Sequence, residues 1–191
     1  MPTHSTALSS EETPEKITLA SGRKKRTTKP KKKPLPRVKL PSNPFQSEIL
    51  DLVCKQRSKE KKIELLQEYR NEALVSLLIW NFDDTVASML PEGDVPYTPN
   101  DAPAGTEHTS LRQECRNFYH FVKGGNDQLS KTRRESIFIQ ILETLLPEEA
   151  QLLCLVKDKR LTEKYKLTHA IVMEAYPDIQ WGGRGGESYK G

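Results

Sequence analysis

One stretch of the chain, residues 21–40, carries ten Lys and Arg residues and no Asp or Glu. Like charges repel one another, and Pro30, Pro34 and Pro36 cannot donate the hydrogen bonds of a helix. The stretch also has few apolar side chains that could fill a core. We therefore expect residues 1–42 to form a disordered basic arm, which leaves folding to the rest of the chain.

The basic arm is joined to a mildly acidic remainder. The 191 residues have a formal net charge of +4, from 30 Lys and Arg against 26 Asp and Glu. Residues 1–43 alone have a net charge of +8, so the remaining 148 residues have a net charge of −4. Hydrophobic residues make up 35% of the chain. This fraction is below the roughly 45–50% of an average globular domain, as expected if part of the chain does not fold.

A tethered polycation binds phosphate, because each neutralised phosphate releases a condensed counterion. Non-specific, electrostatic binding of nucleic acid is therefore the interpretation that we favour for the arm. A nuclear-localisation signal and a solubilising tail without a partner are the alternatives. The residues predicted to contact nucleic acid are Arg23, Lys24, Lys25, Arg26, Lys29, Lys31, Lys32, Lys33, Arg37 and Lys39.

Residues 43–181 contain repeated helix-start signals, each followed by apolar residues at intervals of three and four. Those near residues 43 and 132 have the spacing of capping boxes. The second and third helices could be one, since no Gly or Pro separates them. Few β-branched residues alternate with polar ones, so we predict an all-α domain of six or seven short helices. The expected N-caps or first residues are Asn43, Ser58, Asn71, Thr132, Pro147 and Thr168.

Two segments interrupt or follow this pattern. Residues 91–108 contain four Pro and two Gly residues, and a Pro-rich loop of this length inside a domain is usually functional or mobile. Residues 182–191 are rich in Gly, and we expect a flexible tail. One Arg between Gly pairs gives only a faint likeness to the RGG segments that bind single-stranded nucleic acid.

The segment Phe118–Gly125 combines aromatic residues, Lys123 and two Gly residues, a composition that could stack bases and contact phosphate. Helical spacing places Phe118 and Val122 on one face with Leu111 and Cys115, which favours a core role for them. Tyr119 and Lys123 remain candidates for surface contacts. If the body rather than the arm binds nucleic acid, the first residues to test are Lys123, Lys131, Arg133 and Arg134.

Paired carboxylates at Asp83 and Asp84, with Glu92 and Asp94 nearby, could bind a divalent cation or act as acid and base. Asp is also a common residue at helix ends, and we favour that explanation. The chain lacks phosphate-binding loops and dinucleotide fingerprints, and its four His residues have no metal-site or triad spacing. We expect no enzyme activity, no metal and no cofactor.

The cysteines Cys54, Cys115 and Cys154 are far apart and odd in number, which favours buried free thiols in a reducing compartment. No apolar run approaches the roughly 18–20 residues that span a bilayer, and the N-terminus lacks the pattern of a signal peptide. We expect neither secretion nor membrane insertion.

Several segments, in order, resemble an uncharacterised family of small helical proteins of T4-like tailed phages, of the cyanophage type. They are 81–86, 90–93, 96–97, 121–125, 131–135, 138–143, 146–150 and 174–177. The resemblance covers roughly residues 46–181. It implies a phage origin and expression in a bacterial cytoplasm, which makes the nuclear-localisation alternative remote. It brings no activity or catalytic residue with it.

Three functions follow from these observations. We favour a non-enzymatic phage accessory protein that engages nucleic acid, or a nucleic-acid machine, through its basic arm. The alternative is a virion protein whose body binds other phage proteins while the arm lies against packaged DNA. A metal-dependent enzyme that uses Asp83, Asp84, Glu92 and Asp94 is the third.

Overall fold

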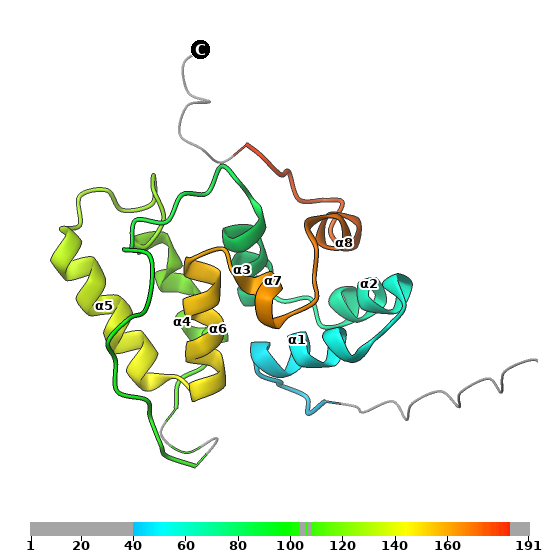
Figure 1. Cartoon of the computed structure of the whole chain (residues 1–191), viewed down its shortest axis with the longest axis horizontal. Coiled ribbons are helices and arrows are strands. Elements are labelled where there is room, and N and C mark those ends of the chain that lie inside the picture. Colours follow the sequence, from blue (N-terminus) through cyan, green and yellow to red (C-terminus); the bar gives the residue numbers. More distant parts are fainter. Residues whose placement is uncertain (1–39, 104–105, 107, 184–191) are drawn as a thin grey trace, which may run out of the picture. The chain divides into compact units, whose positions relative to one another are not determined.

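The computed structural model describes residues 40–103, 106 and 108–183, all of them in the second of the chain's two units, residues 38–191. Its elements, shown in Figure 1, are α1 (Gln46–Lys55), α2 (Lys59–Glu68), α3 (Glu72–Phe82), α4 (Leu111–Glu114), the 3₁₀ helix η1 (Cys115–His120), α5 (Lys131–Thr144), α6 (Pro147–Lys157), α7 (Leu161–Lys164) and α8 (His169–Ala175). Over these ranges the backbone forms isolated bridges but no strand. The predicted all-α class is confirmed.

The described part has eight α-helices rather than the six or seven predicted, because α7 was not expected. The break before α7 is a Schellman motif without glycine. Lys159 adopts a left-handed conformation with φ 56°, and the Arg160 N–H donates to the Leu155 carbonyl at 2.8 Å. A Lys in this conformation leaves no sequence signal. The expected helix over residues 111–122 is also shorter, one α-turn followed by η1.

The caps predicted for the second and third helices are correct. Ser58 Oγ accepts from the Lys61 N–H at 3.3 Å, and Asn71 Oδ1 accepts from the Leu74 N–H at 3.0 Å. Asn71 is fully extended, with φ −149° and ψ 163°, so α2 and α3 are separate helices. Pro147 is the first residue of α6, and Thr168 precedes α8, as predicted.

Both predicted capping boxes are wrong in register. A capping box that starts at Asn43 would use Gln46 as its second residue. Instead, α1 begins at Gln46 itself, and the N–H of its N-cap residue Phe45 donates to the Glu48 carboxylate at 3.0 Å. α5 begins at Lys131 and has Ser130 as its N-cap, before the predicted Thr132. In each case another polar residue nearby makes the bond that fixes the helix start.

Glu149 joins three helix starts and is fully buried. It lies in the first turn of α6, and its carboxylate accepts from the first N–H of α1 (Gln46, 2.7 Å) and the first N–H of α4 (Leu111, 2.9 Å). A helix start has unpaired N–H groups and a partial positive charge, so an anion is favourable there. Burial nevertheless raises the pKa of Glu149, because desolvation outweighs the two backbone donors.

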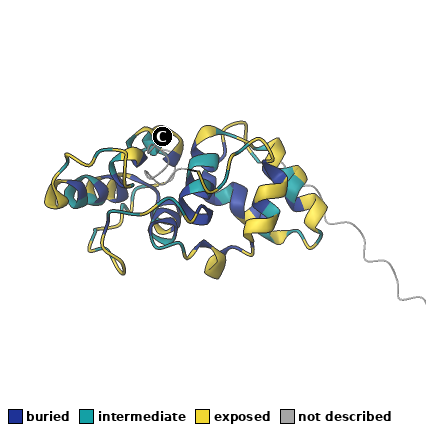
Figure 2. Cartoon of the chain, turned by 90° about the horizontal axis from the view of Figure 1, so that it is seen from above, coloured by how far each residue is buried: buried dark blue, intermediate teal, exposed yellow. Residues whose placement is uncertain are grey.

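The core lies where α6 packs against α1, α3, α5 and α7. Figure 2 shows the buried faces of the helices turned toward one another. Aromatic rings link α3 to η1 and α5: Trp80 lies 5.7 Å from Phe118 and 6.0 Å from Phe121, and Phe121 lies 5.1 Å from Phe138. The core role predicted for Phe118 is therefore confirmed.

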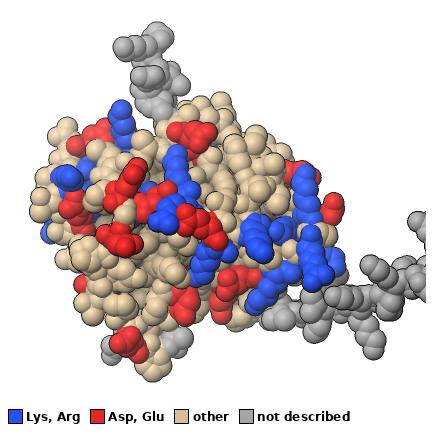
Figure 3. All heavy atoms as spheres, in the orientation of Figure 1, with Lys and Arg blue, Asp and Glu red and all other residues tan. Residues whose placement is uncertain are grey.

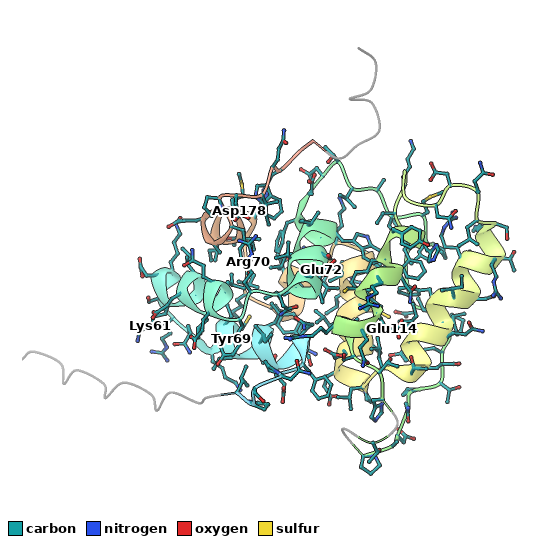
Figure 4. The ribbon with its side chains drawn as sticks, turned by 180° about the vertical axis from the view of Figure 1, so that it is seen from behind. Lys61, Tyr69, Arg70, Glu72, Glu114 and Asp178 are labelled. Atoms are coloured by element: carbon teal, nitrogen blue, oxygen red, sulfur yellow. The ribbon has the colours of Figure 1, made fainter. Side chains whose placement is uncertain are left out.

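α2 packs against α1 and α8, away from α5 (Figure 1). The buried Tyr176 hydroxyl, just after α8, donates to the Leu66 carbonyl at 2.6 Å. At the surface, Arg70 donates two hydrogen bonds to the Asp178 carboxylate, at 2.7 and 2.5 Å (Figure 4). None of the helices in the described ranges is long and apolar enough to cross a membrane.

Candidate nucleic-acid interface

The ten arm residues predicted to contact nucleic acid lie outside the described residues. They are Arg23, Lys24, Lys25, Arg26, Lys29, Lys31, Lys32, Lys33, Arg37 and Lys39. The described part begins at Leu40, whose half-buried side chain packs against the core. The arm therefore joins the body through an anchored residue shortly before α1.

The four body cations named as the first residues to test differ in exposure. Arg134 is buried, with 3% of its area exposed, and donates to the carbonyls of His120 (2.7 Å), Asn126 (3.0 Å) and Leu129 (2.9 Å). It fixes the loop before α5 and is not a surface contact, so its selection was wrong. The other three, Lys123, Lys131 and Arg133, are exposed.

Tyr119 is half exposed, as the surface interpretation of the aromatic segment requires. It borders a hollow of about 250 Å³ that Trp80 and Val122 also line. Phe121 is fully buried and Val122 half-buried, whereas Tyr119 and Lys123 are exposed, so this segment is divided between the core and the surface. The backbone turns after Phe121 because Gly124 has φ 84°, a left-handed conformation.

The four carboxylates considered for metal binding differ in their surroundings. Asp83 is the C-cap residue of α3, and its buried carboxylate accepts from the backbone and side chain of Thr85, at 2.9 and 2.6 Å. This agrees with the helix-end explanation for Asp83. Asp84, Glu92 and Asp94 are exposed. In the part of the chain that the structure describes, no group of three or more His, Cys, Asp or Glu residues could hold a metal ion.

A buried cation anchors the start of the Pro-rich loop. The ammonium of Lys157, at the end of α6, donates to the carbonyls of Pro91 and Gly93, each at 2.9 Å, and pairs with Asp158 at 2.5 Å. A cavity of about 110 Å³ lies between this loop start, α5 and Lys157. The first residues of the loop are thus fastened to the body.

The three cysteines are free thiols, as predicted, but each is half-buried rather than fully buried. Burial raises the pKa of Cys54 and of Cys115, and raises the pKa of Cys154 to about 11. Such thiols are protonated at neutral pH and poor nucleophiles. His169 is exposed and stacks on Phe82, with ring centroids 6.2 Å apart.

The structure assembles a different set of cations that the sequence analysis missed. Figure 3 shows Lys and Arg side chains gathered over α2 and its neighbouring turns. We define the basic face as five exposed residues from the end of α1, the turn into α2, the first turn of α2, α7 and the turn after α7. They are Lys55, Arg57, Lys61, Lys164 and Lys166.

One hydrogen bond ties the two halves of the basic face together. Lys62 is buried, and its ammonium donates to the Lys166 carbonyl at 2.5 Å. This contact brings residues 164–166 beside residues 55–61, about a hundred positions earlier. A sequence signal was present for one half, since residues 55–62 hold five Lys and Arg against one Glu.

Comparison with known proteins identifies a family but no activity. Residues 49–163, more than half of the chain, match the family described as Family of unknown function (DUF6433). The match runs from α1 into α7 and leaves the basic arm outside it. No curated protein and no solved structure matches the chain.

Proposed function

Because the chain belongs to the family of unknown function DUF6433, whose description names no activity, we propose a function from its own residues. The protein is a non-enzymatic accessory protein that engages nucleic acid, or a nucleic-acid machine, through its basic arm. Binding is electrostatic and indifferent to sequence. The helical body is the folded unit that the arm tethers to nucleic acid.

The observation that carries this proposal is the separation of charge along the chain. Ten cations and no acid fall within residues 21–40, while residues 44–191 have a net charge of −4. A segment of this composition attracts phosphate and releases its counterions. An acidic remainder repels phosphate overall, so the arm is the first region to make contact.

The resemblance to helical proteins of T4-like tailed phages supports a phage origin, with action in the cytoplasm of the host bacterium. A virion protein whose arm lies against packaged DNA is the second candidate, since packaged DNA offers the same phosphates. Mass spectrometry of purified virions separates the two. Abundance comparable to known structural proteins would favour the virion protein, and absence would favour the accessory protein.

We assign no catalytic role to Asp83, Asp84, Glu92 or Asp94. Asp83 is engaged by the Thr85 backbone and hydroxyl, an arrangement that closes the end of α3. The alternative of a metal-dependent enzyme has a direct test. A divalent cation that raises the melting temperature of the wild-type chain, but not of Asp83→Asn, would overturn this assignment.

The main test compares the full chain with residues 43–191 in binding to a labelled duplex and a labelled single strand, by fluorescence anisotropy. We expect the full chain to bind both without sequence preference, and the truncated chain to bind poorly. If the truncated chain binds as tightly as the full chain, the arm does not make the contact. Affinity purification from infected cells, with and without nuclease, then shows whether partners are held through nucleic acid.

A further inference from the structure

The cations of the basic face are free to meet a ligand. Within the described ranges, Lys55, Arg57, Lys61 and Lys166 form no ion pair, whereas nearby Lys59 pairs with Glu174. Lys164 donates to the Gln151 side-chain oxygen at 2.6 Å, a neutral partner that leaves its charge uncompensated. The face is therefore positive in a body whose net charge is negative.

Residues 55–62 include one acid, Glu60, and its carboxylate is hydrogen-bonded at the start of α2. Glu60 accepts from the Ser58 hydroxyl at 2.8 Å, at the start of α2. Its pKa is lowered by a backbone hydrogen bond and by Ser58, so it stays ionised beside the α2 N-terminus. There it interacts favourably with the helix dipole and with the nearby charge of Lys59, and it forms no ion pair with a described cation.

The chemistry of the basic face fits a phosphate backbone better than a lipid surface. Peripheral membrane binding combines cations with inserted apolar side chains. In the described ranges the exposed large hydrophobic residues are Tyr119 and Met173, on η1 and α8, and neither belongs to the basic face. The basic face has cations from two chain segments and no exposed apolar side chain between them. This arrangement suits a polyanion whose charges are spaced along its length, such as a phosphate backbone.

We propose that the basic face binds phosphates of the same nucleic acid that the arm contacts, so that each chain holds nucleic acid through two cationic regions. This inference rests on the proposed function. Leu40 and α1 connect the two regions along the chain, so a duplex already bound by the arm is at high effective concentration for the face. The face adds its own counterion release to that of the arm.

The test uses the full chain and four substitutions, Lys55→Gln, Arg57→Gln, Lys61→Gln and Lys166→Gln. Lys62 is kept, because its buried ammonium holds the face together. The matched control replaces four exposed cations elsewhere, Arg116, Lys123, Lys131 and Arg133, with Gln. Both variants lose the same formal charge, so any difference between them reports position. The probe is a fluorescein-labelled duplex of about 30 base pairs, titrated from about 50 to about 200 mM salt.

We expect the basic-face variant to flatten the slope of log affinity against log salt by about 2–3 units, from roughly −0.9 per lost phosphate contact. At about 0.1 M salt this weakens binding by roughly two orders of magnitude. The control should change the slope by less than about one unit. Equal losses in both variants would overturn the proposal, because net charge and not the face would then be responsible.

The remaining outcomes separate this inference from the proposed function. If the basic-face variant binds like the wild type while Lys31→Gln, Lys32→Gln and Lys33→Gln together weaken binding, the arm proposal stands and the face does not. If the triple Lys variant binds like the wild type while the basic-face variant binds more weakly, the basic face stands and the arm proposal does not. A full chain without affinity for DNA or RNA overturns both. If polyglutamate competes for binding as well as DNA does, the partner is an acidic protein and not nucleic acid, and the proposal is overturned.

Melting curves guard against a folding artefact. The four replaced side chains are exposed, so both variants should melt within about 2 °C of the wild type. If the basic-face variant melts lower, the pair Lys61→Gln and Lys166→Gln alone replaces it, with an expected slope change of about half the size. No change from this pair in a folded chain overturns the proposal.

Discussion

The two cationic regions of this chain arise in different ways. The arm has its ten charges in one stretch of twenty residues, next to one another in the sequence. The basic face has five charges from two segments about a hundred residues apart, brought together by α1, α2 and α7. The arm needs no fold to be positive, whereas the face exists only while the body is folded.

The identity of a basic residue therefore does not reveal its use. Lys62, Arg134 and Lys157 are buried, and the side chain of each donates to at least one backbone carbonyl. Their charge serves the fold and is closed to ligands. The cations of the basic face differ from them in position alone, since each projects from a turn or a helix end into solvent.

The largest expected effect concerns the arm. If six of its ten cations contact duplex phosphates, log affinity falls with log salt with a slope of about −5, and binding weakens by about three orders of magnitude between about 50 and 200 mM salt. Replacing Lys31, Lys32 and Lys33 with Gln should flatten the slope by about two to three units and leave the body folded. A slope near zero for the wild type would contradict electrostatic binding by either region.

The next effect concerns the stability of the fold, on which the basic face depends. Glu149→Ala leaves the N–H groups of Gln46 and Leu111 buried without an acceptor, and we expect a loss of roughly 2–4 kcal/mol in the free energy of unfolding. Urea denaturation measures this loss. The matched control is Glu148→Ala, an exposed neighbour in the same helical turn, which should change stability by less than about 0.5 kcal/mol. Equal effects would show that Glu149 does not join the helix starts.

A smaller effect appears as a pH dependence of that same contact. Burial raises the pKa of Glu149 in the folded chain above its value in the unfolded chain. Its protonation then contributes stability that is fully present below the ordinary Glu pKa and is lost as pH rises through the raised pKa. Glu149→Gln cannot titrate. The free energy of unfolding of the wild type should therefore fall relative to Glu149→Gln as pH rises, and an unchanged difference would contradict the raised pKa.

The smallest effect tests the independence of the arm from the fold. Deleting residues 1–39 should leave the melting temperature within about 2 °C of the full chain, because we expect the arm to bury little surface. Deleting residues 1–42 also removes the half-buried Leu40, and should cost about 1 kcal/mol. Differential scanning calorimetry distinguishes the two deletions. A drop of many degrees on removing residues 1–39 would show that the arm docks on the acidic body.

Much of the fold was predictable because helix caps and apolar spacing are local properties. Ser58, Asn71, Pro147 and Thr168 mark helix starts in the structure as in the sequence. The registers of α1 and α5 were not predictable, because Glu48 and Ser130 outcompete the residues that the patterns favoured. The turn before α7 was missed since Lys159 adopts a conformation more typical of Gly.

The sequence by itself determined the all-α class, the helical range and the arm as a phosphate-binding candidate. These properties depend on neighbours a few positions apart, whose spacing and charge act before any tertiary contact forms. Only the tertiary structure decided that Arg134 is buried, that Glu149 joins three helix starts, and that Lys166 lies beside Lys62. Burial and contacts between residues 38 or 104 positions apart are set by how helices pack, and packing depends on every helix at once.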